Sequence, residues 1–160
     1  MINITSYNDK YKDDIIKLVL HCQNDGTRPI VDVSGQQDLL DINDCYFKNG
    51  GFFWTALNEN KLAGTIGLMN YGNGIGMLKK FFVYEDYRGE PYHLGQKLYS
   101  TLLDFAYKNN FKEIYLDTPK NTIRAHKFYK EAGFVQILQD SSPIKFNLIY
   151  AENDFFKLTL

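Results

Sequence analysis

A tyrosine near the end of a predicted helix is the first residue of this chain whose position suggests chemistry. Tyr129 stands four residues before Gly133, and a glycine followed by Phe134 is a typical way to end a helix. A phenol, with an ordinary pKa of about 10, can donate a proton to a leaving group. The chain has 12 tyrosines, so simple packing in the core is the alternative role for Tyr129.

A turn upstream of this helix has the features of a phosphate site. An apolar strand predicted over Met77–Tyr84 runs into the turn YRGEPYHLG at 87–95, which opens an amphipathic helix. Free N–H groups at a helix N-terminus, beside a glycine that allows close approach of the backbone, commonly bind phosphate. The strand, the turn and Tyr129 together indicate an enzyme that uses a phosphate-bearing cofactor.

Hydrophobic spacing predicts the elements that must position these groups. Strands are expected over Ile2–Ser6, Phe52–Leu57, Leu62–Leu68, Met77–Tyr84, Phe111–Leu116, Lys145–Tyr150 and Phe155–Leu160. Helices are expected after Asn8 or Asp9, over Asp38–Lys48, from Leu94 to Asn109, and around Ala125–Ala132. This order indicates one α/β domain over residues 1–160, with a mixed, mostly antiparallel sheet of about seven strands and helices on both faces.

Composition excludes several other classes of protein. A chain of 160 residues with 44% hydrophobic residues can bury one core, and a net charge of −1 offers no basic face for nucleic acid. No secretory signal is visible, and no apolar run approaches the roughly 18 residues of a membrane span, so we expect a cytoplasmic protein. Cys22 and Cys45 are expected to be free thiols, and the absence of clustered ligands argues against a metal site.

The span from residue 52 to residue 134 resembles the GCN5-related N-acetyltransferases, the GNAT family. Their signature is an apolar strand, an Arg/Gln-x-x-Gly-x-Gly/Ala turn into a helix, and a later Tyr-x-x-x-Gly-Phe helix end. The corresponding segments here are LKKFFV at 78–83, YRG at 87–89, LGQKL at 94–98, LDT at 116–118 and FYKEAGF at 128–134. The resemblance implies the GNAT fold and transfer of an acetyl group from acetyl-CoA to an amine.

The resemblance also implies roles for individual residues in binding acetyl-CoA. Phe82 and Val83 would pair through their backbone with the pantetheine arm, and an N–H near Val83 would bind the thioester carbonyl. The pyrophosphate would rest on the turn and the helix start, where the expected contacts are Arg88, Gly89, His93, Leu94, Gly95 and Gln96. Thr122 would contact the cofactor or cap its helix.

In the catalytic step that the resemblance implies, Tyr129 would protonate the departing thiolate of coenzyme A. Direct transfer to the amine is expected, because no Ser or Cys stands in an activated setting. The general base is left open. Met77 occupies the position where many relatives carry a glutamate, and Asp117, Glu85 and Asp86 are acidic alternatives that could equally be ordinary loop residues.

The turn departs from the family pattern, which keeps a rival function open. Two extra residues separate Arg88 from the helix, His93 stands at the first glycine position, and Pro91 has no N–H to donate. These features favour a non-catalytic acyl-CoA-binding or regulatory domain on the same fold. A structural homodimer module is a third alternative. The acceptor is open among small amines, amino acids, antibiotics and peptide N-termini, and the chain is expected to be a monomer or homodimer.

Overall fold

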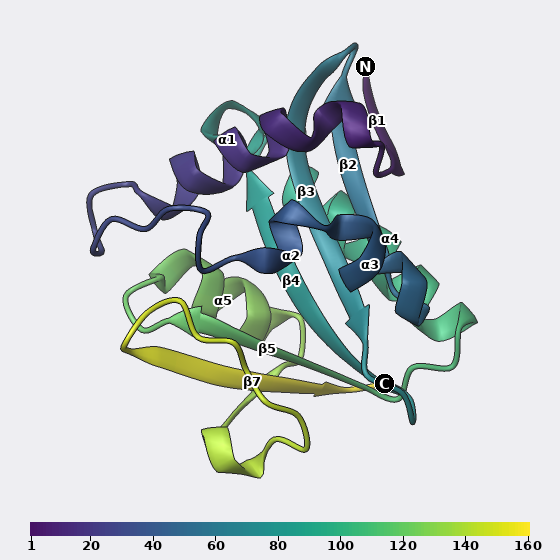
Figure 1. The fold of residues 1–160 in the computed structure, drawn as a ribbon, viewed down its shortest axis with the longest axis vertical. Coiled ribbons are helices and arrows are strands. Elements are labelled where there is room, and N and C mark those ends of the chain that lie inside the picture. Colours follow the sequence, from purple (N-terminus) through teal and green to yellow (C-terminus); the bar gives the residue numbers. More distant parts are fainter.

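Seven strands form one sheet in the order β1-β2-β3-β4-β5-β7-β6 in the computed structural model, which describes all residues from 1 to 160 (Figure 1). The strands are β1 (Ile2–Ser6), β2 (Phe52–Asn58), β3 (Lys61–Asn70), β4 (Ile75–Val83), β5 (Glu113–Pro119), β6 (Val135–Ile137) and β7 (Asn153–Thr159). Only β4 and β5 run parallel to each other, so the sheet is mixed and mostly antiparallel, which confirms the predicted fold class.

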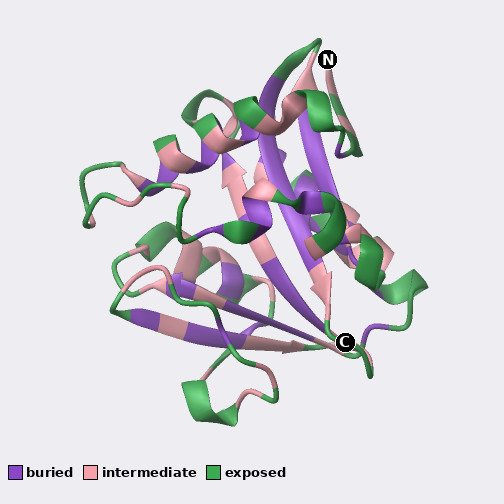
Figure 2. Cartoon of the chain, in the orientation of Figure 1, coloured by how far each residue is buried: buried purple, intermediate pink, exposed green.

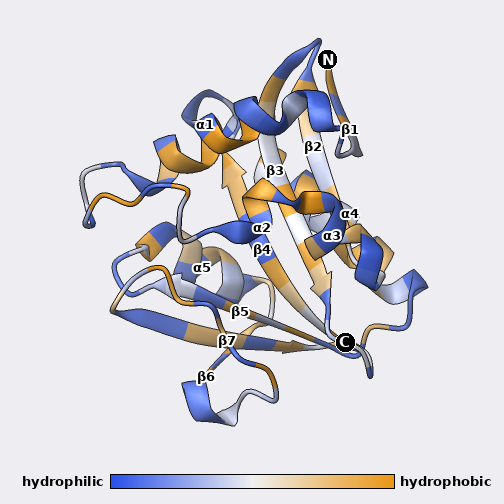
Figure 3. Ribbon diagram, viewed as in Figure 1, coloured by the Kyte–Doolittle hydropathy of each residue, from blue (hydrophilic) through white to orange (hydrophobic).

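Helices cover both faces of the sheet, as predicted. They are α1 (Lys12–Gln23), α2 (Gln37–Leu40), α3 (Ile42–Cys45), α4 (Leu94–Lys108) and α5 (Ile123–Glu131). One core of 18 buried residues lies under α4 and α5, and a second core of 10 lies under α1, α2 and α3 (Figure 1). Each helix turns its apolar side toward one of these cores, as the matching patterns of burial and hydropathy along α1 illustrate (Figures 2 and 3). None of the helices has both the length and the apolar character needed to cross a membrane.

The helix expected over Asp38–Lys48 is broken into α2 and α3, and this part of the prediction is wrong. Asp41 separates the two short helices with a non-helical backbone at φ −147° and ψ 62°. The break allows Asp38 and Tyr46, which would be about 12 Å apart along a continuous helix, to meet. The Tyr46 hydroxyl donates to Asp38 Oδ2 at 2.7 Å.

The same carboxylate pairs with a buried lysine of β4. Lys80 Nζ lies 3.3 Å from Asp38 Oδ1, and the two side chains are only 3% and 7% exposed. Burial lowers the pKa of Lys80, and the negative charge of Asp38 opposes this effect. The ion pair therefore ties α2 to the middle of β4.

The strand expected over Lys145–Tyr150 is also wrong, because this stretch is irregular and the sixth strand is β6. The outer edge of β7 is already occupied by β6, which pairs Val135–Ile137 with residues 155–157. One aromatic residue of the stretch is buried without a strand: Phe146 packs against Phe155 with ring centroids 4.8 Å apart. Hydrophobicity alone does not distinguish such a packed loop from a strand.

Two irregularities of β4 shape the centre of the fold. Its pairing with β5 covers only Ile75–Met77 against Glu113–Tyr115, and beyond Met77 the two strands diverge (Figure 1). Its pairing with β3 is interrupted by a bulge, at which Lys80 takes a left-handed backbone at φ +51°. The hydroxyl of Thr65 donates to the Lys80 carbonyl at 2.8 Å and satisfies the oxygen at the bulge.

Replacing Asp38 should reveal how strongly this buried pair supports the fold. Asp38→Asn should lower the free energy of unfolding by about 3–5 kcal/mol, because the Lys80 ammonium would stay buried without its partner. Urea unfolding at neutral pH measures the change. Lys80→Met in the same background should recover part of the loss. Glu131→Gln, which removes the exposed pair with Lys127, should cost less than about 1 kcal/mol, and equal losses for Asp38 and Glu131 would contradict the assignment.

Candidate active site

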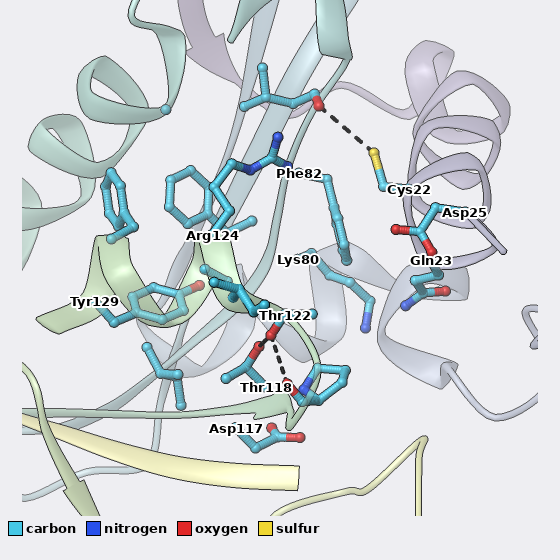
Figure 4. Close-up of a pocket in the computed structure, with 18 of the residues that line it drawn as sticks. Cys22, Gln23, Asp25, Lys80, Phe82, Asp117, Thr118, Thr122, Arg124 and Tyr129 are labelled. Atoms are coloured by element: carbon cyan, nitrogen blue, oxygen red, sulfur yellow. Dashed lines mark hydrogen bonds between the residues drawn. The ribbon is translucent and has the colours of Figure 1, made fainter. Parts of the chain in front are cut away.

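A cavity of about 620 Å³ lies where β4 and β5 diverge. Residues 78–83 of β4 line one side of it and residues 116–119 of β5 line the other. The start of α5, the end of α1 and the loop before β7 complete the wall (Figure 4). Its volume lies within the range of about 300–1,000 Å³ that is usual for small-molecule sites.

Most of the site residues predicted from the sequence line this cavity. They are Phe82, Val83, Arg88, Gly89, Gly95, Gln96, Thr122 and Tyr129. His93 and Leu94 do not, and the longer turn explains why. The turn folds back so that the His93 N–H donates to Gly89 O at 2.7 Å, which leaves this N–H unable to bind a phosphate. The Leu94 side chain is completely buried in the core beneath α4.

The N-terminus of α4 still presents free N–H groups at the mouth of the cavity. The first helical hydrogen bond of α4 runs from the Lys97 N–H to His93 O at 3.2 Å. The N–H groups of residues 94–96 therefore have no acceptor within the helix. A Cβ added to Gly95 would meet only the Phe81 ring, at an ordinary 3.7 Å. The packing of the chain therefore does not itself require glycine here, whereas close approach of a bound group to the backbone would.

Two arginines face the same part of the cavity. Arg88 is held by the chain: its Nε donates to Val83 O at 2.9 Å, and its Nη2 lies 3.6 Å from Glu85 Oε1. Arg124, at the start of α5, has no hydrogen bond or ion pair. Its pKa is lowered by burial and then by the like charge of Arg88. Arg124 could not be found from the sequence, because nothing in the stretch NTIRAH at 121–126 distinguishes it from an ordinary helical arginine.

Thr122 uses its hydroxyl within the β5–α5 loop. The hydroxyl donates to Pro119 O at 2.7 Å and accepts from the Thr118 hydroxyl at 2.7 Å. It makes no capping bond to the N–H groups of α5, so the expected cap is wrong. The neighbouring Asn121 points away from the helix and donates to Thr27 O at 2.7 Å, which ties this loop to the segment after α1.

Tyr129 projects from α5 into the centre of the cavity. Its side chain is only 7% exposed, and Figure 4 shows its hydroxyl directed toward the gap between the strands. The ring is fixed by aromatic neighbours, with centroids 5.5 Å from Phe134 and 6.2 Å from Phe156. No protein group is hydrogen-bonded to the hydroxyl, so it is available to a ligand.

Burial keeps the phenol of Tyr129 protonated. Desolvation raises its pKa well above the ordinary value, and the nearby negative charge of Asp117 raises it further. A buried, protonated phenol can act as a proton donor throughout the neutral range. The cavity therefore places a buried phenol beside the free edge of β4.

The acidic candidates named from the sequence occupy different positions. Asp117 lines the cavity from β5, and burial raises the pKa of its carboxyl. Glu85 also lines the cavity, but it accepts hydrogen bonds from His21 Nε2 at 3.0 Å. Asp86 lies outside the cavity. Met77, at the position of the family's glutamate, is buried in a small core with Tyr115 and offers no base.

Comparisons with known proteins agree on one family. A sequence model of the acetyltransferase (GNAT) family matches residues 17–134. An acetyltransferase from Streptococcus agalactiae superposes with a TM-score of 0.92 and 33% identity, over 99% of this chain and 98% of that one. A GNAT-family acetyltransferase from Staphylococcus aureus superposes with a TM-score of 0.92 and 34% identity, over 99% of each chain. Human N-acetyltransferase 8B is 28% identical over 110 residues, which cover 65% of this chain and 48% of that protein.

The extent of these matches differs between relatives. The chain spans about half the length of the curated relatives it matches. It shares its whole fold with the two bacterial acetyltransferases, including the sheet and the helices that enclose the cavity. On the family match and the shared fold, this chain belongs to the GNAT family of acetyltransferases.

Proposed function

We propose that the protein transfers the acetyl group of acetyl-CoA directly to a primary amine. The observation that carries the proposal is the buried phenol of Tyr129, which lines the gap between β4 and β5 and has no hydrogen-bond partner in the protein. Thioester aminolysis needs a proton donor for the departing thiolate, and a phenol in this position supplies one. Membership of an acetyltransferase family supports the same reaction.

The free edge of β4 suits the pantetheine arm of acetyl-CoA. Residues 78–83 pair with β3 on one side only, because β5 has diverged, so their other backbone edge faces the cavity. An extended arm that carries amide groups can bind such an edge as an added strand would. In this arrangement the backbone near Val83 would also donate to the thioester carbonyl.

The phosphates of acetyl-CoA would lie at the cavity mouth near α4. The N–H groups of residues 94–96 and the positive end of the helix dipole favour an anion there. Arg88 and Arg124 add two positive charges, and Arg124 has no competing partner in the protein. The longer turn lacks two N–H donors for phosphate, because Pro91 has no N–H and the N–H of His93 is bonded to Gly89 O. The two guanidinium groups would compensate for this loss.

Direct transfer is favoured over a covalent acyl-enzyme. Cys22 is the only cysteine that lines the cavity, and burial raises the pKa of its thiol. A thiol that stays protonated is a poor nucleophile. Acetylation of the acceptor in one step therefore needs only groups that the cavity presents.

The rival proposal is an acyl-CoA-binding domain without catalysis. The altered turn favours it, because His93 stands where the family has glycine and its N–H is bonded to Gly89. Binding of acetyl-CoA is common to both proposals, whereas release of free coenzyme A in the presence of an amine is specific to the enzyme. The following two predictions separate them.

Acetyl-CoA should stabilise the fold, and Arg124 should contribute to its affinity. At 100 times its dissociation constant the ligand should add about 2.7 kcal/mol to the free energy of unfolding, measured as a shift in Tm. Arg124→Gln should weaken binding by roughly 10-fold or more, as expected for loss of a charged hydrogen bond to phosphate. Acetyl-pantetheine, which lacks the nucleotide phosphates, should bind the variant and the wild type equally.

Lys130→Gln is the matched control for Arg124, because Lys130 lies on the same helix but faces solvent. It should leave the affinity for acetyl-CoA unchanged. The absence of any stabilisation by acetyl-CoA would contradict both the enzyme and the binding domain. An equal effect of the two substitutions would contradict only the role of Arg124.

Tyr129→Phe should lower kcat by about 100-fold or more, because the departing thiolate would lose its proton donor. Free thiol release from acetyl-CoA, measured over a panel of primary amines, gives the rate. The affinity for acetyl-CoA and the Tm should stay unchanged, since the hydroxyl has no partner in the protein. Tyr107→Phe, on the exposed side of α4, is the control and should have wild-type kinetics. Wild-type turnover by Tyr129→Phe at every pH would rule out the acid role.

A further inference from the structure

Asp117 enters the same gap as Tyr129, but from the opposite face of the sheet. Its neighbours Leu116 and Tyr115 belong to different cores: Leu116 packs under α4 and α5, and Tyr115 packs on the other side. Because side chains alternate along a strand, Asp117 points to the face of Tyr115, which carries α1 and α2. Tyr129 comes from α5 on the face of Leu116, so the two groups flank the gap (Figure 4).

Asp117 also lies just past the last residue pair that joins β4 and β5. That pair is Met77 and Tyr115, and beyond it no strand covers this edge of β5. The carboxylate therefore lines the cavity at the point where the gap begins to open. A ligand that enters from the face of α1 and α2 would meet this group on its way to the free edge of β4.

Asp117 is the one cavity carboxylate without a partner. The cavity holds two others: Asp25 pairs with Arg28 at 3.6 Å, and Glu85 is bonded to His21 and lies near Arg88. No side chain forms a hydrogen bond or an ion pair with Asp117, which is partly buried, and only the charges of Lys79 and Lys80 act on it from nearby. A partly buried carboxylate without a bonded partner would gain from a cation supplied by a ligand.

Few charged or titratable groups face Asp117 from the elements around it. Lys79 and Lys80 lie on β4, and Lys80 is already paired with Asp38. Tyr129 on α5 and Tyr71 in the β3–β4 turn are neutral phenols, and the negative charge of Asp117 raises the pKa of each. Burial raises the pKa of Asp117 more than the two lysines lower it, so its proton affinity exceeds that of an ordinary aspartate.

We propose that Asp117 is the general base of the reaction: it binds the acceptor as an ammonium ion and takes one of its protons. The inference rests on the proposed acetyl transfer and assigns the second group that this reaction needs. It also specifies the acceptor, which would reach the gap from the face of α1 and α2 as a protonated primary amine. Tyr129 and Asp117 would then act from opposite faces on the two partners of the reaction.

All protons and electron pairs of the proposed step are accounted for. The ammonium gives one proton to the Asp117 carboxylate, and the neutral nitrogen attacks the thioester carbon. The carbon–sulfur bond breaks, and its electron pair stays on the sulfur, which takes the phenol proton of Tyr129. The second proton lost by the nitrogen returns to the Tyr129 oxygen through solvent, and Asp117 releases its proton to water. The products are the N-acetylated amine, free coenzyme A and one proton.

Asp117→Asn keeps the size of the side chain and removes the base. With the best primary amine from a panel of amino acids, an aliphatic diamine and a short peptide, kcat/KM at pH 7 should fall by about 100-fold or more. The variant should depend on amine that is already neutral, so its kcat/KM should rise about 10-fold per pH unit below the pKa of the amine. The wild type should be flat in this range and fall only where acid protonates Asp117. Acetyl-CoA affinity should not change.

The controls separate a base from a structural group. Asp104→Asn, on the exposed side of α4, should have wild-type kinetics at every pH. The Tm of Asp117→Asn should equal or exceed that of the wild type, because the partly buried carboxylate forms no hydrogen bond or ion pair that the substitution would break. If this variant does not fold, Asp117→Ser, which also lacks a base, should give the same pH profile.

Three other outcomes would contradict the base assignment, and one of them would also contradict the proposed function. Wild-type rates for Asp117→Asn at all pH values would overturn the base assignment and leave acetyl transfer standing. A large loss with the same pH profile as the wild type would also overturn it, because a positioning role alone would produce that result. A wild type that binds acetyl-CoA but acetylates no amine would overturn the proposed function and this inference together.

Discussion

Three residue pairs hold β4 and β5 together, Ile75–Met77 against Glu113–Tyr115, and each functional feature of the molecule depends on the separation of the strands beyond them. A parallel pair in the middle of a sheet would normally continue along its length. Here the bulge at Lys80 turns β4 away, and the Lys80–Asp38 ion pair fixes the bulge to α2. The gap left between the strands leaves one backbone edge of residues 78–83 without a partner strand. This edge is the physical basis for binding an extended, amide-bearing ligand.

The proposed reaction gives the phenol and the carboxyl of the gap different roles. Burial raises the pKa of both Tyr129 and Asp117, and it therefore favours the protonated form of each. For Tyr129 this preserves a proton donor, and for Asp117 it increases the affinity for a proton delivered by a ligand. Neither group has a hydrogen-bond partner in the protein, which leaves both available to a ligand. The two faces of one sheet thus separate the groups that would serve the two substrates.

Local patterns in the sequence predicted the elements that hold the site. The apolar run of β4, the leucine spacing of α4 and the four-residue step from Tyr129 to Gly133 each reflect one element packing on one core, so each is visible in a short window. The helix over Asp38–Lys48 and the strand over Lys145–Tyr150 failed because contacts distant in sequence decided them. Asp38 had to meet Tyr46 and Lys80, and the edge of β7 was already taken by β6. Arg124 and the isolation of Asp117 depend on the shape of the cavity, which no local pattern records.

A crystal structure with coenzyme A and an unreactive acceptor amine would show whether both substrates meet in the gap between β4 and β5. We expect the pantetheine arm along residues 78–83 of β4, with its sulfur within hydrogen-bond distance of the Tyr129 hydroxyl. We also expect the amine on the side of the gap lined by Asp117. Coenzyme A bound outside the gap, or a sulfur with no path to the Tyr129 hydroxyl, would contradict the proposed reaction.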